Sequence, residues 1–234
     1  RWQQIPTESS SIDSLYFNYR IGYVNLFDNV NNLSSMIYID SRLIFNKNFY
    51  VYLFPRVVSN SKSFPRFSGL PRKIPRFGFT SGENDIAGIG FENHKLILQI
   101  GRGRQSWLAG NDIGIALNEE SYGYDYGLFG LKLENFRGRF IHGFLETDSS
   151  NFNRYITSRG IEWTNNNSLV VGLSEVVIYS GESRSFDFAY FNPISSHLEI
   201  ELNNRQNKLG VSSGNAIWQI SLDWMLNERS RLSC

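Results

Sequence analysis

Two stretches decide the fold: residues 15–23, which read LYFNYRIGY, and residues 218–224, which read WQISLDW. In both, every second residue is apolar, and most of the residues between are polar or glycine. Successive side chains of a strand point to opposite faces, so this alternation gives a strand one apolar and one polar face. Residues 197–202, HLEIEL, alternate in the same way and predict a further strand. The pattern is typical of an antiparallel all-β protein.

The alternation recurs along most of the chain, and the connections are rich in Asn, Ser, Gly and Asp. These residues form tight turns, so neighbouring strands are expected to pair as hairpins. Two segments interrupt the rhythm: residues 61–76, with three of the six prolines, and residues 101–121, rich in glycine. Both are predicted to be loops. We predict strands near 14–24, 35–45, 49–58, 74–80, 85–92, 95–102, 112–117, 124–134, 136–146, 153–163, 168–179, 196–204 and 216–226.

The composition favours an up-and-down transmembrane β-barrel. Aromatic residues make up 15% of the 234 residues, yet the mean hydropathy is −0.30. A barrel reconciles the two values, because only alternate residues face lipid. A soluble β-sandwich would show the same alternation, but several predicted strands exceed the usual length of about 5–6 residues. Aromatic residues also gather at the predicted strand ends, as in an interfacial girdle: Tyr16, Tyr23, Tyr124, Tyr126, Trp163, Tyr179, Trp218 and Trp224.

Charge and cysteine content exclude several classes of function. The formal net charge is +1, from 23 basic and 22 acidic residues, which does not favour nucleic acid as a partner. The only cysteine is Cys234, so neither an internal disulfide nor a structural zinc site is expected. The three histidines lack metal-ligand spacing, and no phosphate or dinucleotide motif occurs, so we expect no cofactor.

We expect one domain over residues 1–234. The sequence begins at Arg1 without an initiator Met or a signal peptide, and residues after the last predicted strand form no closing aromatic strand. From this we expect an incomplete barrel, truncated at both ends.

An ordered set of short motifs occupies the C-terminal half. They are Gly101-Arg102 followed by Trp107 and Gly110, then Asn153–Ile156 (NRYI) with Arg159 and Glu162, Gly172–Tyr179 (GLSEVVIY), Phe191-Asn192-Pro193 and Leu222-Asp223-Trp224. In this order they resemble the capsule-assembly (Wzi-type) outer-membrane proteins over about residues 99–226. The resemblance implies a barrel in the bacterial outer membrane, in contact with its lipid. It also implies a lectin-like, non-enzymatic role in binding or organising capsular polysaccharide.

Two departures from the family leave the ligand's identity open. The family's loop usually has a Trp-Gly-Pro-Gly core, whereas this chain has Trp107-Leu108-Ala109-Gly110. The family's Asp-Asn before the last strand is replaced by Gly214-Asn215.

The first candidate site combines Arg102, Arg104 and Trp107. An indole can stack on a sugar ring, and guanidinium groups can bind the carboxylate of an acidic sugar in a forked geometry. In the alternative interpretation, Trp107 packs its loop against the barrel and the arginines pair with acids in the lumen.

The second candidate is Glu175, which shares the outward register of Leu169, Val171 and Leu173. A carboxylate that faces lipid is costly, so we expect a β-bulge to turn Glu175 inward. There it would form an ion-pair network in the lumen, or a ligand contact, with Arg154, Arg159 and Glu162.

Other charged residues are expected to line the inside of the barrel. Glu199, Glu201 and Asp223 are expected on the inner face with Arg20 and Arg42. In an open pore they would set ion selectivity, so a porin-like channel for ions or small sugars is the alternative function. A soluble carbohydrate-binding sandwich is the third. A glycosidase needs two carboxylates set across a cleft, which the acids near Trp107 do not specifically indicate.

Overall fold

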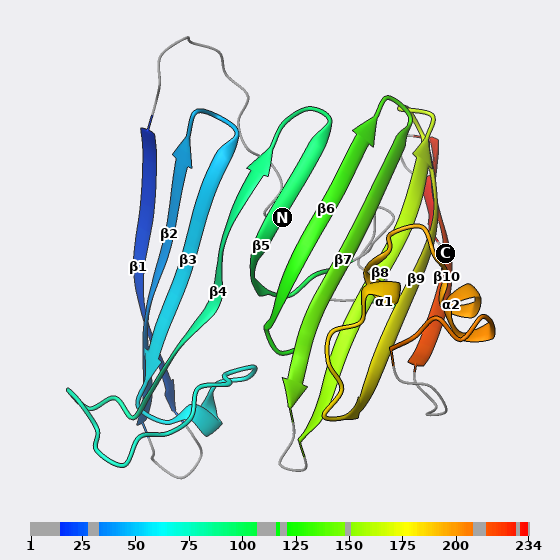
Figure 1. Cartoon of the computed structure of the whole chain (residues 1–234). Helices are drawn as coiled ribbons and strands as arrows, with labels where there is room; N and C mark the ends of the chain where they lie inside the picture. The colour runs from blue at the N-terminus through cyan, green and yellow to red at the C-terminus, as the bar shows by residue number, and fades with distance from the viewer. Residues whose placement is uncertain are drawn as a thin grey trace.

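The computed structural model describes residues 15–27, 33–106, 116–117, 121–147, 151–207, 214–227 and 230–233. They form one 11-stranded antiparallel sheet in which each strand pairs with the next along the chain (Figure 1). The predicted all-β, up-and-down topology is confirmed. Within the described residues the sheet is open, with β1 and β11 at its edges, as in an incomplete barrel. The strands are β1 (Leu15–Phe27), β2 (Leu33–Phe45), β3 (Phe49–Val58), β4 (Ser81–Glu92), β5 (Leu96–Gly103), β6 (Tyr124–Leu133), β7 (Phe136–Thr147), β8 (Phe152–Thr164), β9 (Leu169–Glu182), β10 (Gly214–Asn227) and β11 (Ser230–Ser233).

Two predicted strands differ from the structure, and a third lies mostly outside the described residues. Residues 74–80 contain only an isolated bridge between Arg76 and Phe79, and β4 begins after them. Residues 112–115 lie outside the described residues, and residues 116–117 form a bend. Residues 196–204 contain the helix α2 (His197–Leu202), because the Ser196 side chain accepts a hydrogen bond from the Glu199 N–H and caps the helix. The predicted loop at 61–76 is confirmed and includes the short helix η1 (Ser61–Ser63).

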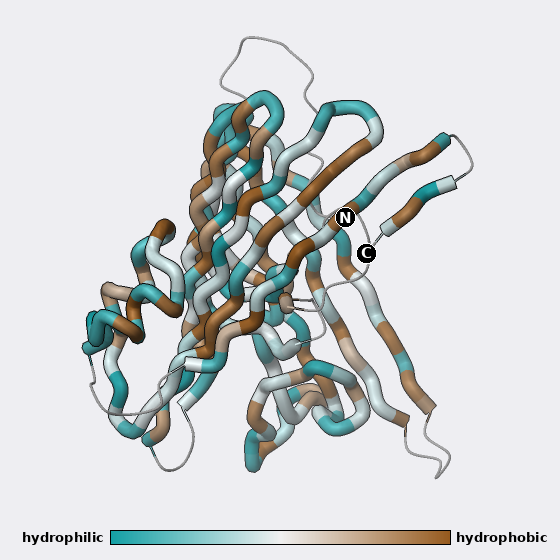
Figure 2. The backbone as a smooth tube through the Cα atoms, turned by 90° about the vertical axis from the view of Figure 1, so that its right-hand side faces the viewer, coloured by the Kyte–Doolittle hydropathy of each residue, from teal (hydrophilic) through white to brown (hydrophobic). Residues whose placement is uncertain are grey.

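The two faces of the sheet differ in polarity. The inner face is concave, and the outer face is convex (Figure 2). Directly paired residues share a face, so the register places Asn18 and Arg20 on the inner face and Phe17 and Ile21 on the outer face. On β10, Ile220 on the outer face is 76% exposed, while Gln219 and Ser221 on the inner face are 8% and 7% exposed. This is the reverse of a water-soluble sheet.

The aromatic residues at the predicted strand ends do not all lie on the outer face. By register, Tyr23, Trp163, Trp218 and Trp224 lie on the outer face. Tyr16, Tyr124 and Tyr126 lie on the inner face instead, and Tyr179 is buried under a connection. Only these four could therefore belong to an outer girdle, because position near a strand end does not determine the face, and the girdle itself stays a prediction.

Connections of unequal length join the strands. At one end, the top of Figure 1, the connections between β2 and β3, β4 and β5, β6 and β7, and β8 and β9 are tight turns. At the other end lie the long connections, residues 59–80, 104–123 and 183–213. Outer-membrane barrels have this asymmetry, with short periplasmic turns and longer extracellular loops.

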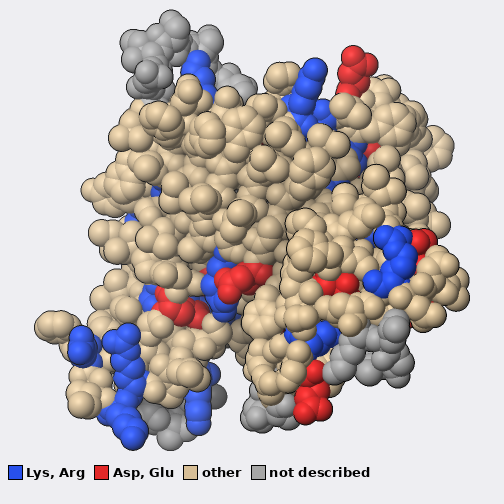
Figure 3. All heavy atoms as spheres, viewed as in Figure 1, with Lys and Arg blue, Asp and Glu red and all other residues tan. Residues whose placement is uncertain are grey.

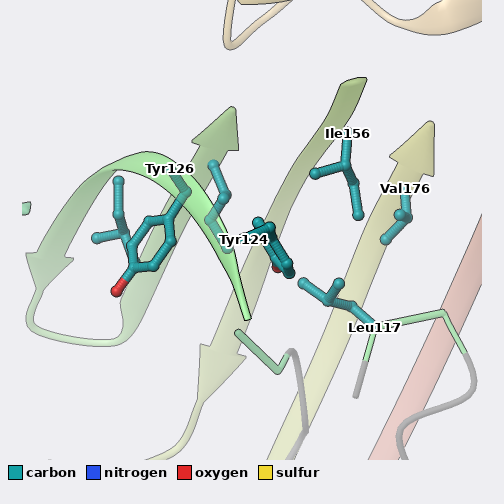
Figure 4. Close-up of a cluster of buried hydrophobic side chains, with 7 residues drawn as sticks. Leu117, Tyr124, Tyr126, Ile156 and Val176 are labelled. Atoms are coloured by element: carbon teal, nitrogen blue, oxygen red, sulfur yellow. The ribbon is translucent and has the colours of Figure 1, made fainter. Parts of the chain in front are cut away.

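The long connections fold onto the sheet and form three apolar clusters. Phe64 and Phe67 of residues 59–80 pack on Val58 at the inner face. Leu117 packs on Tyr124 and its neighbours, also at the inner face (Figure 4). The connection after β9 contains α1 (Phe188–Phe191) and α2, and it covers part of the outer face. The described strands form a single sheet, so the sandwich alternative, which requires two packed sheets, is wrong.

None of the described helices is long and apolar enough to cross a membrane.

Candidate functional site

The structure does not gather the predicted site residues into one place. Arg102 lies on the outer face of β5, with Asp125 3.4 Å away. Arg154 of β8 forms an exposed ion pair with Glu146 near the end of β7. Trp107 lies outside the described residues. The role of these residues in polysaccharide binding stays a prediction.

Arg104 belongs to a buried cluster of charges just after β5. It forms an ion pair with Asp85 of β4, and Asp85 also lies 3.2 Å from Arg56 of β3. The Arg56 Nε donates to Glu83 at 2.6 Å, and Arg56 also donates to the Arg66 backbone carbonyl at 2.6 Å. These contacts tie residues 59–80 to the sheet. Because each charge in the cluster faces an opposite charge, the geometry favours pairing with acids over a free sugar-binding guanidinium.

Glu175 and Arg159 lie together on the outer face. Strand β9 pairs with β8 and β10 without a register shift at Glu175, so the expected bulge is wrong. The carboxylate of Glu175 is 3.2 Å from the Arg159 Nε and accepts the His197 N–H at 3.0 and 3.2 Å. Glu162 faces the opposite side of the sheet and pairs with Arg137 at 3.0 Å. The predicted network that joins Glu162 to Glu175 is therefore wrong.

Of the five charged residues predicted on the inner face, three lie there and two lie on the outer side. Arg20 and Arg42 lie on the inner face of β1 and β2, and Asp223 lies on the inner face of β10, where it accepts a 2.6 Å hydrogen bond from Arg231. Glu199 and Glu201 belong to α2 on the outer side of the sheet, so their predicted inner placement is wrong. The hydrogen bond from Arg205 lowers the pKa of Glu199.

The inner face carries tyrosine–glycine pairs that the alternation within each strand does not predict. Tyr38 of β2 lies directly opposite Gly22 of β1, and on β3 and β4 Tyr50 and Tyr52 lie opposite Gly90 and Gly88. A Cβ atom at any of these glycines would overlap the tyrosine opposite; at Gly88 it would lie 2.5 Å from the Tyr52 hydroxyl. Each tyrosine therefore lies across its glycine. The available signal was glycine at inner, polar positions of the alternation.

Two of these tyrosines form a polar aromatic surface with Gln99 and Arg42. The rings of Tyr50 and Tyr52 stack with their centroids 6.1 Å apart, and both residues are half-buried. Gln99 of β5 donates to the Tyr52 hydroxyl at 2.5 Å and to the Tyr126 hydroxyl at 2.8 Å. Arg42 lies opposite Tyr52 in the register. We call Tyr50, Tyr52, Gln99 and Arg42 the tyrosine strip.

The strip has the groups that a saccharide site uses. Its rings can stack against the apolar face of a sugar, and its hydroxyls, amide and guanidinium can form hydrogen bonds. Its position on a concave face suits ligand binding. Among the described residues, no three His, Cys, Asp or Glu side chains gather as a metal site would require. Comparison with protein-family models, curated proteins and solved structures gives no match.

Proposed function

We propose that this chain forms part of the wall of a bacterial outer-membrane barrel that binds or organises capsular or another surface polysaccharide without catalysis. One observation carries the proposal: the outer face over β1–β5 is mostly apolar and uncovered, with Arg102 at the end of β5 as a charged exception, while charged side chains such as Arg20 and Arg42 lie on the inner face. The outer residues Phe17, Ile21, Ile89 and Ile100 are between 58% and 70% exposed. Exposed apolar surface on this scale requires a membrane or a protein partner, and the spacing by two residues fits lipid around a barrel.

The inner face supports the choice of ligand. On the proposed function, the rings of the tyrosine strip stack on sugar rings while Gln99 contacts hydroxyl groups. Arg42 favours a saccharide with carboxylate groups, because guanidinium binds carboxylate in a forked geometry. The resemblance to the capsule-assembly (Wzi-type) proteins points to the same class of ligand.

The connections favour binding over an open channel. Phe64, Phe67 and Leu117 all pack on the inner face. The Ala116 N–H also donates to the Gln219 side chain of β10 at 2.9 Å, so the chain between β5 and β6 reaches across the inner face as far as β10. Chain that occupies the inner space supports a binding barrel over a porin.

The test uses the full-length protein in planar bilayers and in a binding assay with an acidic polysaccharide, polygalacturonate, and a neutral one, dextran. We expect no steady conductance and saturable binding of polygalacturonate. The Tyr50→Leu/Tyr52→Leu variant should bind about tenfold more weakly, equivalent to about 1.4 kcal/mol. Tyr19→Leu is the matched control, because Tyr19 is an exposed tyrosine on the outer face. Ohmic conductance without binding would contradict the proposal and favour the porin.

A further inference from the structure

The segment from residue 183 to residue 207, which follows β9, buries two charged residues and exposes several large apolar ones. Its charged residues Arg184 and Asp187 are each 2% exposed. Its apolar residues Phe188, Ile194 and Leu202 are 80%, 90% and 79% exposed. In water the opposite arrangement is favoured. We call residues 183–207 the outer cover, because they lie on the convex face of the sheet (Figure 2).

The outer cover lies over a polar patch of the outer face. Beneath it, Thr157 donates to the Tyr190 carbonyl at 3.2 Å, and Arg159 donates to the Asn192 carbonyl at 3.0 Å. Glu175 accepts the His197 N–H. Tyr190 stacks on Tyr179 of β9, with ring centroids 4.4 Å apart. The underside of the cover therefore makes these polar contacts beside a buried apolar cluster that includes Tyr190 and Ile200.

Several backbone N–H and carbonyl groups in the non-helical parts of the outer cover form hydrogen bonds with side chains. The Arg184 carbonyl accepts hydrogen bonds from Asn153 and Tyr155, and the Ser185 and Phe186 carbonyls accept from the Asn207 side chain. The Ala189 and Ile194 N–H groups donate to Asp187 and Asn192. Water would satisfy such groups on a soluble surface. Internal satisfaction of non-helical backbone is what hydrocarbon requires.

We propose that the outward side of this cover is a lipid-contacting surface that inserts its apolar side chains into the acyl region of the bilayer. The inference rests on the proposed function, which places β1–β5 in the membrane, and extends it to a segment outside the strands. The cover joins exposed apolar residues of β8, β9 and β10, namely Ile161, Leu173 and Trp218, so the apolar outer surface continues across the polar patch.

The remaining charges set the depth of insertion. Glu199 and Arg205 are exposed, and their contacts of 2.6 and 2.7 Å pair the two charges. The segment also follows the strand end that bears the long connections. We infer that it lies at the boundary between headgroups and acyl chains, with Ile194 and Leu202 pointing to the acyl chains and the ion pair at the headgroups.

The test is site-directed spin labelling of the full-length protein in phosphatidylcholine vesicles, with Cys234→Ser as background. Single cysteines replace Ile194, Leu202, Ile21 and Arg20. We expect labels at 194 and 202 to be more accessible to oxygen than to a water-soluble nickel chelate, as at Ile21 on the outer face of β1. The label at Arg20 on the inner face should show the reverse.

The outcomes separate this inference from the proposed function. A lipid-exposed label at 21 with water-exposed labels at 194 and 202 would overturn the outer cover as a lipid surface and leave the barrel intact. Labels at 194 and 202 that neither oxygen nor the chelate reaches would overturn it in favour of a protein partner. A water-exposed label at 21 would overturn the proposed membrane location, and the inference with it.

Discussion

The outer faces of β1–β5 and of β7–β9 share the two-residue alternation, but they differ in the polarity of their outward residues and in whether another segment covers them. In the first region the outward residues are mostly apolar and lie uncovered, as with Ile21 and Ile89. In the second region the outward residues include His142, Thr157, Arg159 and Glu175, all of them buried under the outer cover. Figure 3, which shows the convex side, has a band without charged side chains over the upper part of this face, above a row of charges near its middle. In β7–β9, these polar residues in the outward register therefore lie beneath a covering segment of the same chain.

The largest effect on stability is expected from removing one partner of the buried ion pair between Arg159 and Glu175. Glu175→Leu leaves the Arg159 charge buried without its carboxylate, and we expect a loss of about 3–5 kcal/mol in the free energy of unfolding. Urea titration of the protein in lipid vesicles measures it. The double variant Arg159→Met/Glu175→Leu should recover most of the loss, because no charge is then buried alone. Equal losses in both variants would show that packing, and not charge, dominates this patch.

The second prediction compares one ring from each region. Tyr190→Leu removes the stack on Tyr179 and the 3.1 Å hydrogen bond to Glu201, so we expect a loss of about 1–3 kcal/mol. Phe17→Leu, at an uncovered position of β1, should change stability by less than about 0.5 kcal/mol. The same urea titration checks both variants, and a Phe17→Leu effect as large as that of Tyr190→Leu would remove the distinction between the regions.

The third prediction compares glycines on the two faces. Gly90→Ala would place a methyl group against the Tyr50 ring, which must move, at a cost of about 1–3 kcal/mol. Gly127→Ala is the control, since no neighbouring atom lies within 4 Å of a Cβ atom built there. Gly90→Ala should also weaken polygalacturonate binding, while Gly127→Ala should leave both stability and affinity unchanged.

The smallest effect concerns the exposed ion pair of the outer cover. Arg205→Gln should raise the pKa of Glu199 toward its ordinary value, because the Arg205 hydrogen bond lowers it. A lowered carboxyl pKa stabilises the fold above the ordinary pKa, and this contribution disappears as the pH falls through the lowered value. Carbon-13 NMR titration of labelled glutamate should show the shift. An unchanged titration of Glu199 would mean that the pair does not persist in solution.

Most of the sheet could be predicted from the sequence, because alternation over ten or more residues gives both strand and face. The helix α2 could not be predicted by that rule. The residues of HLEIEL alternate for only six positions, and the capping pair Ser196 and Glu199 gives the competing helical signal.

The site is harder to predict than the sheet, because its contacts join segments that are far apart in the sequence. The alternation correctly places Glu175 in the outward register, but the predicted bulge rests only on the cost of a carboxylate in lipid. Nothing in the local sequence shows that a segment some 20 residues later returns to supply the His197 N–H. The Tyr–Gly pairs were missed because cross-strand register is not visible from a single strand.

The most direct test of the two-faced sheet is cysteine labelling along β1 of the full-length protein in vesicles, again with Cys234→Ser. Single cysteines at 17, 18, 19, 20 and 21 are treated with a small water-soluble methanethiosulfonate reagent. If the sheet separates lipid from an aqueous interior, positions 18 and 20 react fast and positions 17, 19 and 21 react slowly. Equal rates at all five positions, or the opposite phase, would contradict a membrane-embedded outer face.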